Sequence, residues 1–182
     1  MKFAALCALP YDAGTDRIDI ESLRTELPDI PNAVLVQFCA DHGRNSEFQK
    51  QYGHLDLGEI AWTLRSTSAR EICECSMNEV FRSWFEEVSQ RAAQFPRRRW
   101  ACIDVRREVQ EHWRSHATWI ESPVMIDGSL VGPGSALHLV EGHTRVGLLA
   151  GLVQRSIVSP GSIHSIWLGS IIDSRGPSDA PW

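Results

Sequence analysis

The chain has 182 residues, of which 43% are hydrophobic, and its formal net charge is -5. This length suits one compact domain with a substantial core, and the negative charge excludes a general electrostatic attraction to nucleic acid or to an anionic membrane. No apolar stretch approaches the roughly 20 residues needed to cross a bilayer. The cysteines lack the spacing of a disulfide framework, so we expect reduced thiols in a soluble, cytoplasmic protein.

The N-terminal region, residues 1–115, is predicted to be mainly helical with one or two strands. Apolar residues three and four apart predict a helix over 18–27, with Asp19 near its start and Pro28 after its end. The apolar run over 33–38 predicts a buried strand that leads into a polar loop.

Further helices are predicted in the middle of the chain. The residues over 57–62 could open one helix, and the hydroxyl residues over 66–68 offer caps for the next. That second helix is predicted over 69–94, with Pro96 as its end, because its apolar positions recur at helical steps. An amphipathic helix is then predicted over 105–116.

The C-terminal section, residues 116–175, has the pattern of a strand-turn-helix-strand core. A helix is predicted over 143–155 and a flexible tail over 176–182. Strands are predicted at 118–128, 137–140 and 162–172. The whole chain therefore predicts an α+β fold, in which a helical N-terminal part packs on a small mixed β-sheet domain.

The turn formed by Glu141, Gly142, His143, Thr144 and Arg145 is the main candidate for a functional site. It joins a predicted strand to a predicted helix, whose first backbone N–H groups and dipole favour an anion. Gly142 permits close approach of phosphates, Thr144 adds a hydroxyl, and Arg145 can clamp phosphate oxygens. Glu141 could serve as a base or a metal ligand. The alternative is a structural turn, in which Arg145 pairs with a carboxylate and His143 caps the helix.

With its flanking strand and helix, this turn resembles that of the ParB/sulfiredoxin-like superfamily. The resemblance covers the chain from about Trp119 onward. It implies that ATP, ADP or CTP binds with magnesium. The residues implied in holding the nucleotide are Gly142, His143, Thr144 and Arg145. Those implied in catalysis are Glu141, His143 and Arg145, and the implied metal ligands are Glu141 and Glu121, although Glu121 could instead be an exposed acid at a strand end.

The resemblance implies a nucleotide-binding protein that hydrolyses or transfers a phosphoryl group. Sulfiredoxins carry a cysteine where this chain has His143, which argues against sulfinic acid reduction. One alternative is a non-enzymatic, immunity-like regulatory protein that binds a protein partner through the helical N-terminal part, with Trp62, Trp84 and Phe85 at its surface. Another alternative is a metal-dependent nuclease.

A basic run, Arg97-Arg98-Arg99, precedes Trp100 and lies near further arginines in the sequence. Such a patch could meet phosphates by charge and a base by stacking. The competing interpretation is a solvated helix end, where cations complement the helix dipole. Nucleic acid is therefore a possible partner but is not favoured.

Overall fold

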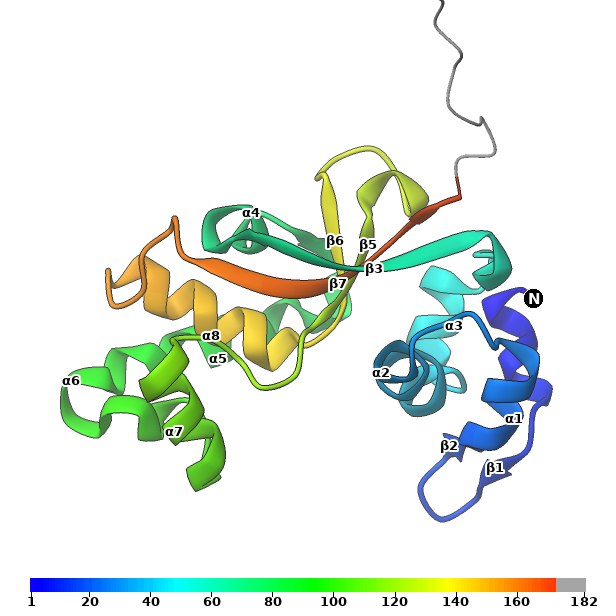
Figure 1. The fold of residues 1–182 in the computed structure, drawn as a ribbon, viewed down its shortest axis with the longest axis horizontal. Coiled ribbons are helices and arrows are strands. Elements are labelled where there is room, and N and C mark those ends of the chain that lie inside the picture. The colour runs from blue at the N-terminus through cyan, green and yellow to red at the C-terminus, as the bar shows by residue number, and fades with distance from the viewer. Residues whose placement is uncertain (173–182) are drawn as a thin grey trace, which may run out of the picture.

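The computed structural model describes residues 1–172 and shows an α+β fold, as predicted, while the predicted tail at 176–182 lies outside the described residues. A five-stranded sheet connects two groups of helices, one built from the N-terminal residues and the other containing α5 to α8 (Figure 1). Within residues 1–172, no helix has both the length and the apolar character needed to span a bilayer.

The central sheet is mixed and has the strand order β3-β7-β5-β6-β4. Its strands are β3 (Ile60–Ser68), β4 (Ser76–Met77), β5 (Val124–Asp127), β6 (Leu137–Glu141) and β7 (Ile163–Ile171). The pairs β3/β7 and β5/β6 are antiparallel, and the pairs β5/β7 and β4/β6 are parallel. Since β3 and β4 come from the first 115 residues, the predicted division between residues 1–115 and 116–175 runs through this sheet.

The N-terminal group forms one end of the molecule. Its elements are η1 (Phe3–Ala8), β1 (Tyr11–Asp12), β2 (Arg17–Ile18), α1 (Ile20–Glu26), α2 (Asn32–Val34), η2 (Leu35–Ala40), α3 (Ser46–Tyr52) and η3 (Leu57–Glu59). The predicted helix over 18–27 is confirmed as α1, where the Asp19 carboxylate accepts a hydrogen bond from the backbone N–H of Ser22 at 2.8 Å. The strand predicted over 33–38 is wrong, because this segment is helical throughout.

The second group supplies the other helices. They are α4 (Ala69–Cys73), η4 (Glu79–Phe81), α5 (Arg82–Arg91), η5 (Ala92–Gln94), α6 (Phe95–Arg98), η6 (Arg99–Cys102), α7 (Arg107–His116) and α8 (His143–Gln154). The 3-10 turn η7 (Gly128–Leu130) lies between β5 and β6 in the chain, and its Leu130 packs against the N-terminal cluster. The helix predicted over 57–62 is confirmed only as the short 3-10 helix η3 and is wrong from Ile60 onward, where strand β3 begins. The helix predicted over 69–94 is interrupted by β4. Pro96 lies in the first turn of α6, where its missing N–H costs no hydrogen bond.

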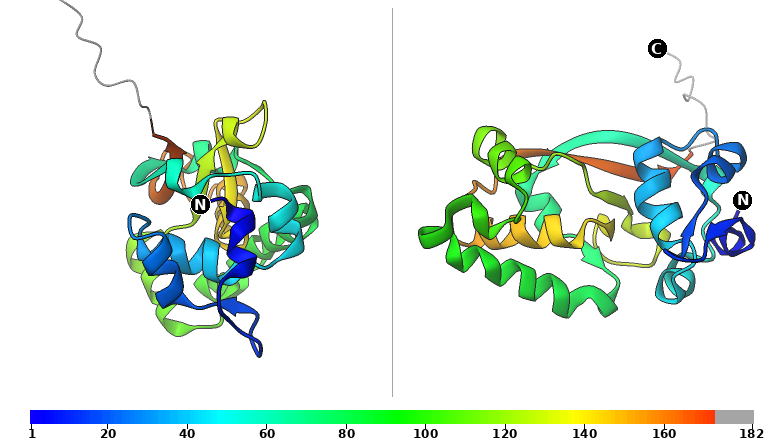
Figure 2. Two further views of the ribbon diagram at one scale, coloured as in Figure 1. Left: turned by 90° about the vertical axis from the view of Figure 1, so that its right-hand side faces the viewer. Right: turned by 90° about the horizontal axis from the view of Figure 1, so that it is seen from below.

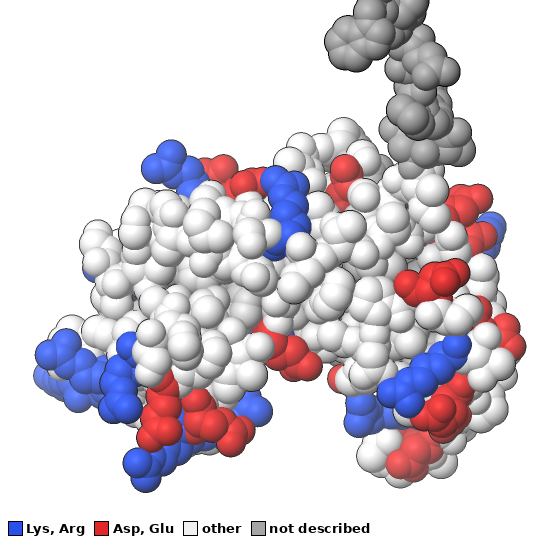
Figure 3. All heavy atoms as spheres, in the orientation of Figure 1, with Lys and Arg blue, Asp and Glu red and all other residues white. Residues whose placement is uncertain are grey.

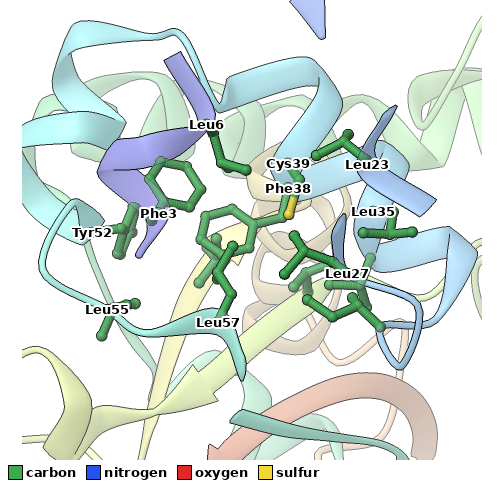
Figure 4. Packing of buried hydrophobic residues seen from close by; sticks show 14 of the residues in the cluster. Phe3, Leu6, Leu23, Leu27, Leu35, Phe38, Cys39, Tyr52, Leu55 and Leu57 are labelled. Carbon is green, nitrogen blue, oxygen red and sulfur yellow. The ribbon is translucent and has the colours of Figure 1, made fainter. Parts of the chain in front are cut away.

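Two hydrophobic clusters form the core of the protein. The N-terminal cluster gathers Phe3, Phe38 and Tyr52 from η1, η2 and α3 (Figure 4), and the rings of Phe3 and Phe38 stack with centroids 4.5 Å apart. The second cluster lies between the sheet and α8 and includes residues of α5 and α7. Helix α8 runs beside α5 (Figure 2), and Gly151 lets them approach closely, because a Cβ there would overlap the Ser89 carbonyl.

Candidate functional site

The turn between β6 and α8 places the start of a helix at the junction of the two groups. Gly142 has φ +100°, and a Cβ at this position would lie 2.5 Å from the Cβ of Pro123. The first helical hydrogen bond runs from the Val146 N–H to the Gly142 carbonyl at 2.9 Å, and no side chain of the described residues caps the helix at Gly142. The N–H groups that precede this bond have no acceptor four residues back within α8, and groups of this kind can bind an anionic ligand.

The guanidinium of Arg145 ties this turn to two distant segments. Its Nη1 donates to the Glu121 carbonyl at 2.9 Å, and its Nη2 donates to Gln37 Oε1 at 2.6 Å. The same group forms ion pairs with the carboxylates of Glu121, at 3.5 Å, and Glu141. The buried Gln37 side chain in turn donates to the Ser122 carbonyl at 3.3 Å. The structure thus brings Arg145 and both predicted metal ligands together.

These contacts predict a measurable structural role for Arg145. We expect Arg145→Met to lower the free energy of unfolding by about 2 kcal/mol, because it leaves the buried Gln37 amide oxygen without its donor. Urea unfolding followed by tryptophan fluorescence measures this change. The matched control is Arg24→Met, whose exposed guanidinium also bonds an asparagine and a glutamate, and which should cost under about 0.5 kcal/mol. Equal losses in the two variants would contradict the role assigned to Arg145.

His143 begins α8 with an unsatisfied polar atom. The residue is 8% exposed, and its Nε2 has no hydrogen-bond partner within residues 1–172. Burial lowers the pKa of His143 to about 4, with further lowering by His42, His138 and Arg145, so the imidazole is neutral at pH 7. A neutral imidazole can donate or accept one hydrogen bond at Nε2, according to its tautomer. It therefore suits a polar ligand group better than a charged acid role.

A small slot of about 280 Å³ lies against His143. Its walls are largely aromatic: the His42 ring stacks on Phe48 with centroids 4.1 Å apart, and the Phe81 ring lies 4.5 Å from that of His143. Glu141, Thr144 and Trp84 complete the lining. Burial is the main cause that lowers the pKa of His42, while Glu141 and Asp41 act in the opposite direction.

A larger pocket of about 670 Å³ is lined in part by Arg145. Thr144 contributes to both cavities, and its hydroxyl accepts a hydrogen bond from Trp84 Nε1 at 3.3 Å. Trp119 and Ile120 supply apolar walls, and the charged lining consists of three acids, Asp104, Glu108 and Glu121, and two arginines, Arg106 and Arg145. Figure 3 shows a separate hollow between the two helical groups. The volume of the pocket falls within the range of small-molecule sites.

The residues present fit a magnesium ion only if a nucleotide shares its coordination. No group of three or more potential metal-ligating side chains occurs within residues 1–172, so the protein does not form a complete cage there. The carboxylates of Glu121 and Glu141 nevertheless both form ion pairs with the guanidinium of Arg145. Two carboxylates with phosphate oxygens and water are a usual environment for Mg²⁺. Such an ion would compete with Arg145 for the carboxylate oxygens.

Two other buried histidines belong to the core rather than to the site. The ring nitrogens of His138 bond Tyr52 and Ser76, each at 2.9 Å. His164 bonds Thr118 and Ser162, also at 2.9 Å. Burial lowers the pKa of both histidines to about 4. With both nitrogens occupied, neither imidazole has a polar atom left for a ligand.

Sequence reasoning missed the contributions of Gln37 and His42. Both follow Pro31 in the segment that was predicted as a strand and loop, and they reach the site from η2 and the residues just after it. The one available signal is that Gln37 is the only polar residue in an otherwise apolar run. A buried polar side chain needs a partner, which here is Arg145.

Comparison with known proteins adds no further indication of function. No protein-family model, curated protein or solved structure matches the chain. The geometry of the turn and its two cavities is therefore the basis on which a function can be proposed.

Proposed function

We propose that the turn from Glu141 to Arg145 binds the phosphates of a nucleotide, such as ATP, ADP or CTP, in the manner of the ParB/sulfiredoxin-like proteins that it resembles. The observation that carries this proposal is that, within the described residues 1–172, no side chain caps the start of α8 and the buried His143 Nε2 beside it has no hydrogen-bond partner. Backbone N–H groups at a helix start favour phosphate oxygens, and a neutral imidazole can add a hydrogen bond.

The larger pocket would hold the base and sugar of the nucleotide. It opens directly from Thr144 and Arg145, and its volume of about 670 Å³ exceeds what a phosphate group alone would fill. Apolar walls from Val109 and Ile120 suit a base or a sugar face. Glu121 and Glu141 would share a magnesium ion with the phosphates, and the ion's charge would offset the repulsion between these carboxylates and the nucleotide.

Calorimetric titration of ATP, ADP and CTP with magnesium tests the proposal. We expect Arg145→Lys to weaken binding tenfold or more, about 1.4 kcal/mol, because lysine keeps the charge but loses the planar fork that holds the turn. The matched control is Arg155→Lys, which changes an arginine at the other end of α8 that bonds Gln90 and Gln154. If no nucleotide binds, or if both variants bind like the wild type, the proposal is wrong.

A second measurement separates binding from turnover. We expect phosphate release from the bound nucleotide to depend on magnesium and to be lost in Glu141→Gln, which removes one of the two carboxylates at the site. Glu121→Gln, at a side chain that is 60% exposed, should weaken only the magnesium-dependent part of binding. Binding without turnover would instead favour the regulatory protein. DNA cleavage that EDTA abolishes would favour the nuclease.

The residues expected to bind a protein partner do not form a shared exposed patch. Trp62 packs against the N-terminal cluster and Phe85 against the second cluster, both partly buried. Trp84 is 41% exposed, but its indole N–H donates to Thr144 at the candidate site. The nucleotide proposal therefore has more support from the described residues than the protein-binding alternative.

A further inference from the structure

An arginine-rich groove lies on the second helical group, away from the β6–α8 turn. It has a volume of about 650 Å³ and is formed by α6, η6 and α7. Four arginines line it: Arg98, Arg99, Arg107 and Arg114. Figure 3 shows basic side chains gathered over α6 at this end of the molecule. We refer to this cavity as the arginine groove.

The charge of the groove contrasts with that of the chain. Its lining contains four arginines and one acid, Glu111, which gives +3, whereas the whole chain carries -5. Glu111 pairs with Arg107 at 2.7 Å, and the one side-chain hydrogen bond of Arg98 within the described residues goes to the neutral Gln94 at 3.0 Å. Arg99 and Arg114 form no ion pair with any residue in 1–172. Most of this positive charge is therefore not neutralised within the described protein.

Aromatic rings form part of the same lining. Phe95 and Trp100 meet edge to face with centroids 4.9 Å apart, and Trp100 is supported from behind by the buried Trp113, at 6.1 Å. The Arg99 guanidinium lies 5.8 Å from the centre of the Phe95 ring. Both aromatic side chains are only partly buried, so they remain within reach of a ligand.

We propose that the arginine groove binds single-stranded nucleic acid. Guanidinium groups bind phosphate oxygens bidentately, and aromatic rings stack on unpaired bases, which a duplex keeps inside its helix. Charge complementarity selects a polyanion, and the aromatic lining favours a nucleic acid strand over an acidic peptide or a lipid surface. Outside this groove the remaining charge is about -8, from -5 minus +3, which repels a strand from most of the rest of the protein.

Fluorescence anisotropy with labelled 12-nucleotide oligothymidine and oligouridine tests this proposal. We expect saturable binding at 50 mM salt and a loss of about tenfold or more in the double variant R98Q/R114Q, whose side chains are exposed and form no ion pair in residues 1–172. Loss of two phosphate contacts should also reduce the slope of log affinity against log salt by about 1.4. The matched control is R24Q/R82Q, two exposed arginines elsewhere, which should change the affinity less than about twofold.

Three outcomes would overturn the proposal: no saturable binding to either oligonucleotide, an equal loss in R24Q/R82Q, or tighter binding to polyglutamate or anionic lipid vesicles than to the oligonucleotides. Oligonucleotide binding to the arginine groove can be tested separately from nucleotide binding at the β6–α8 turn. Arg145→Lys should leave oligonucleotide affinity unchanged, and R98Q/R114Q should leave the calorimetric affinity for ATP, ADP or CTP unchanged. The two proposals can therefore fail separately.

Discussion

Acidification from pH 7 to pH 5 is expected to lower the free energy of unfolding by on the order of 5 kcal/mol. The cause is the set of three buried histidines, His138, His143 and His164, which are 2%, 8% and 2% exposed. Burial lowers the pKa of each from 6.5 to about 4. Between these values the unfolded chain binds a proton at each site and the native protein does not, so stability is lost as the pH falls.

Urea unfolding at several pH values measures this effect. Because unfolding takes up three protons, the free energy of unfolding should change by about 4 kcal/mol per pH unit in the middle of the window between pH 6.5 and 4. His164→Gln should reduce that slope by about 1.4 kcal/mol per pH unit, whatever it does to stability at pH 7.5. The control is the exposed Ser115→Gln, which removes no titratable group and should leave the slope unchanged. A wild-type slope near zero between pH 6 and 5 would show that these imidazoles titrate in the native state.

Gly142→Ala is expected to destabilise the protein by about 3 kcal/mol and to weaken nucleotide binding. An L-residue at φ +100° carries a backbone strain of about 1–2 kcal/mol, and steric overlap in a packed region adds about 1–3 kcal/mol. The overlap here is with Pro123, whose Cβ lies 2.5 Å from the position of the new methyl group. Relief of that overlap would move the start of α8, and with it the N–H groups proposed to hold phosphate.

Gly134→Ala separates strain from overlap, because Gly134 also has a positive φ, +149°, but no atom of residues 1–172 beyond its chain neighbours lies within 4 Å of an added Cβ. We expect this control to cost about 1–2 kcal/mol and to leave nucleotide affinity unchanged. Chemical unfolding and calorimetry measure the two effects. If Gly142→Ala proves no more destabilising than Gly134→Ala, the contact with Pro123 does not constrain the turn.

The local structure of the candidate site was predictable because its signals are local. A short apolar strand, a glycine and a helical apolar pattern predict the order of β6, turn and α8, and the structure confirms this order. The environment of Arg145 was not predictable from sequence spacing. Gln37 reaches it from 108 residues away and Glu121 from 24 residues away, and such contacts depend on how the two helical groups pack.

The errors in the predicted fold have a common physical cause. The segment at 33–38 belongs to a stretch that is buried along most of its length, so neither a period of two nor one of 3.6 is visible, and a short apolar run is compatible with both structures. Strand β3 has the opposite problem: its central residues are exposed, and pairing with β7, not a hydrophobic pattern, makes it a strand. Helix 69–94 is broken where β4 pairs with β6, again a contact distant in sequence.

The position of β7 within the sheet has a consequence for biosynthesis. This strand occupies the place between β3 and β5, yet it lies about 100 residues after β3 in the chain. At roughly 5–20 residues per second, a ribosome needs on the order of 5–20 s to make the intervening segment. During that interval β3 exposes unpaired backbone groups and side chains that are buried in the folded protein, such as Ile60, and we expect the nascent chain to be vulnerable to aggregation or dependent on a chaperone until β7 emerges.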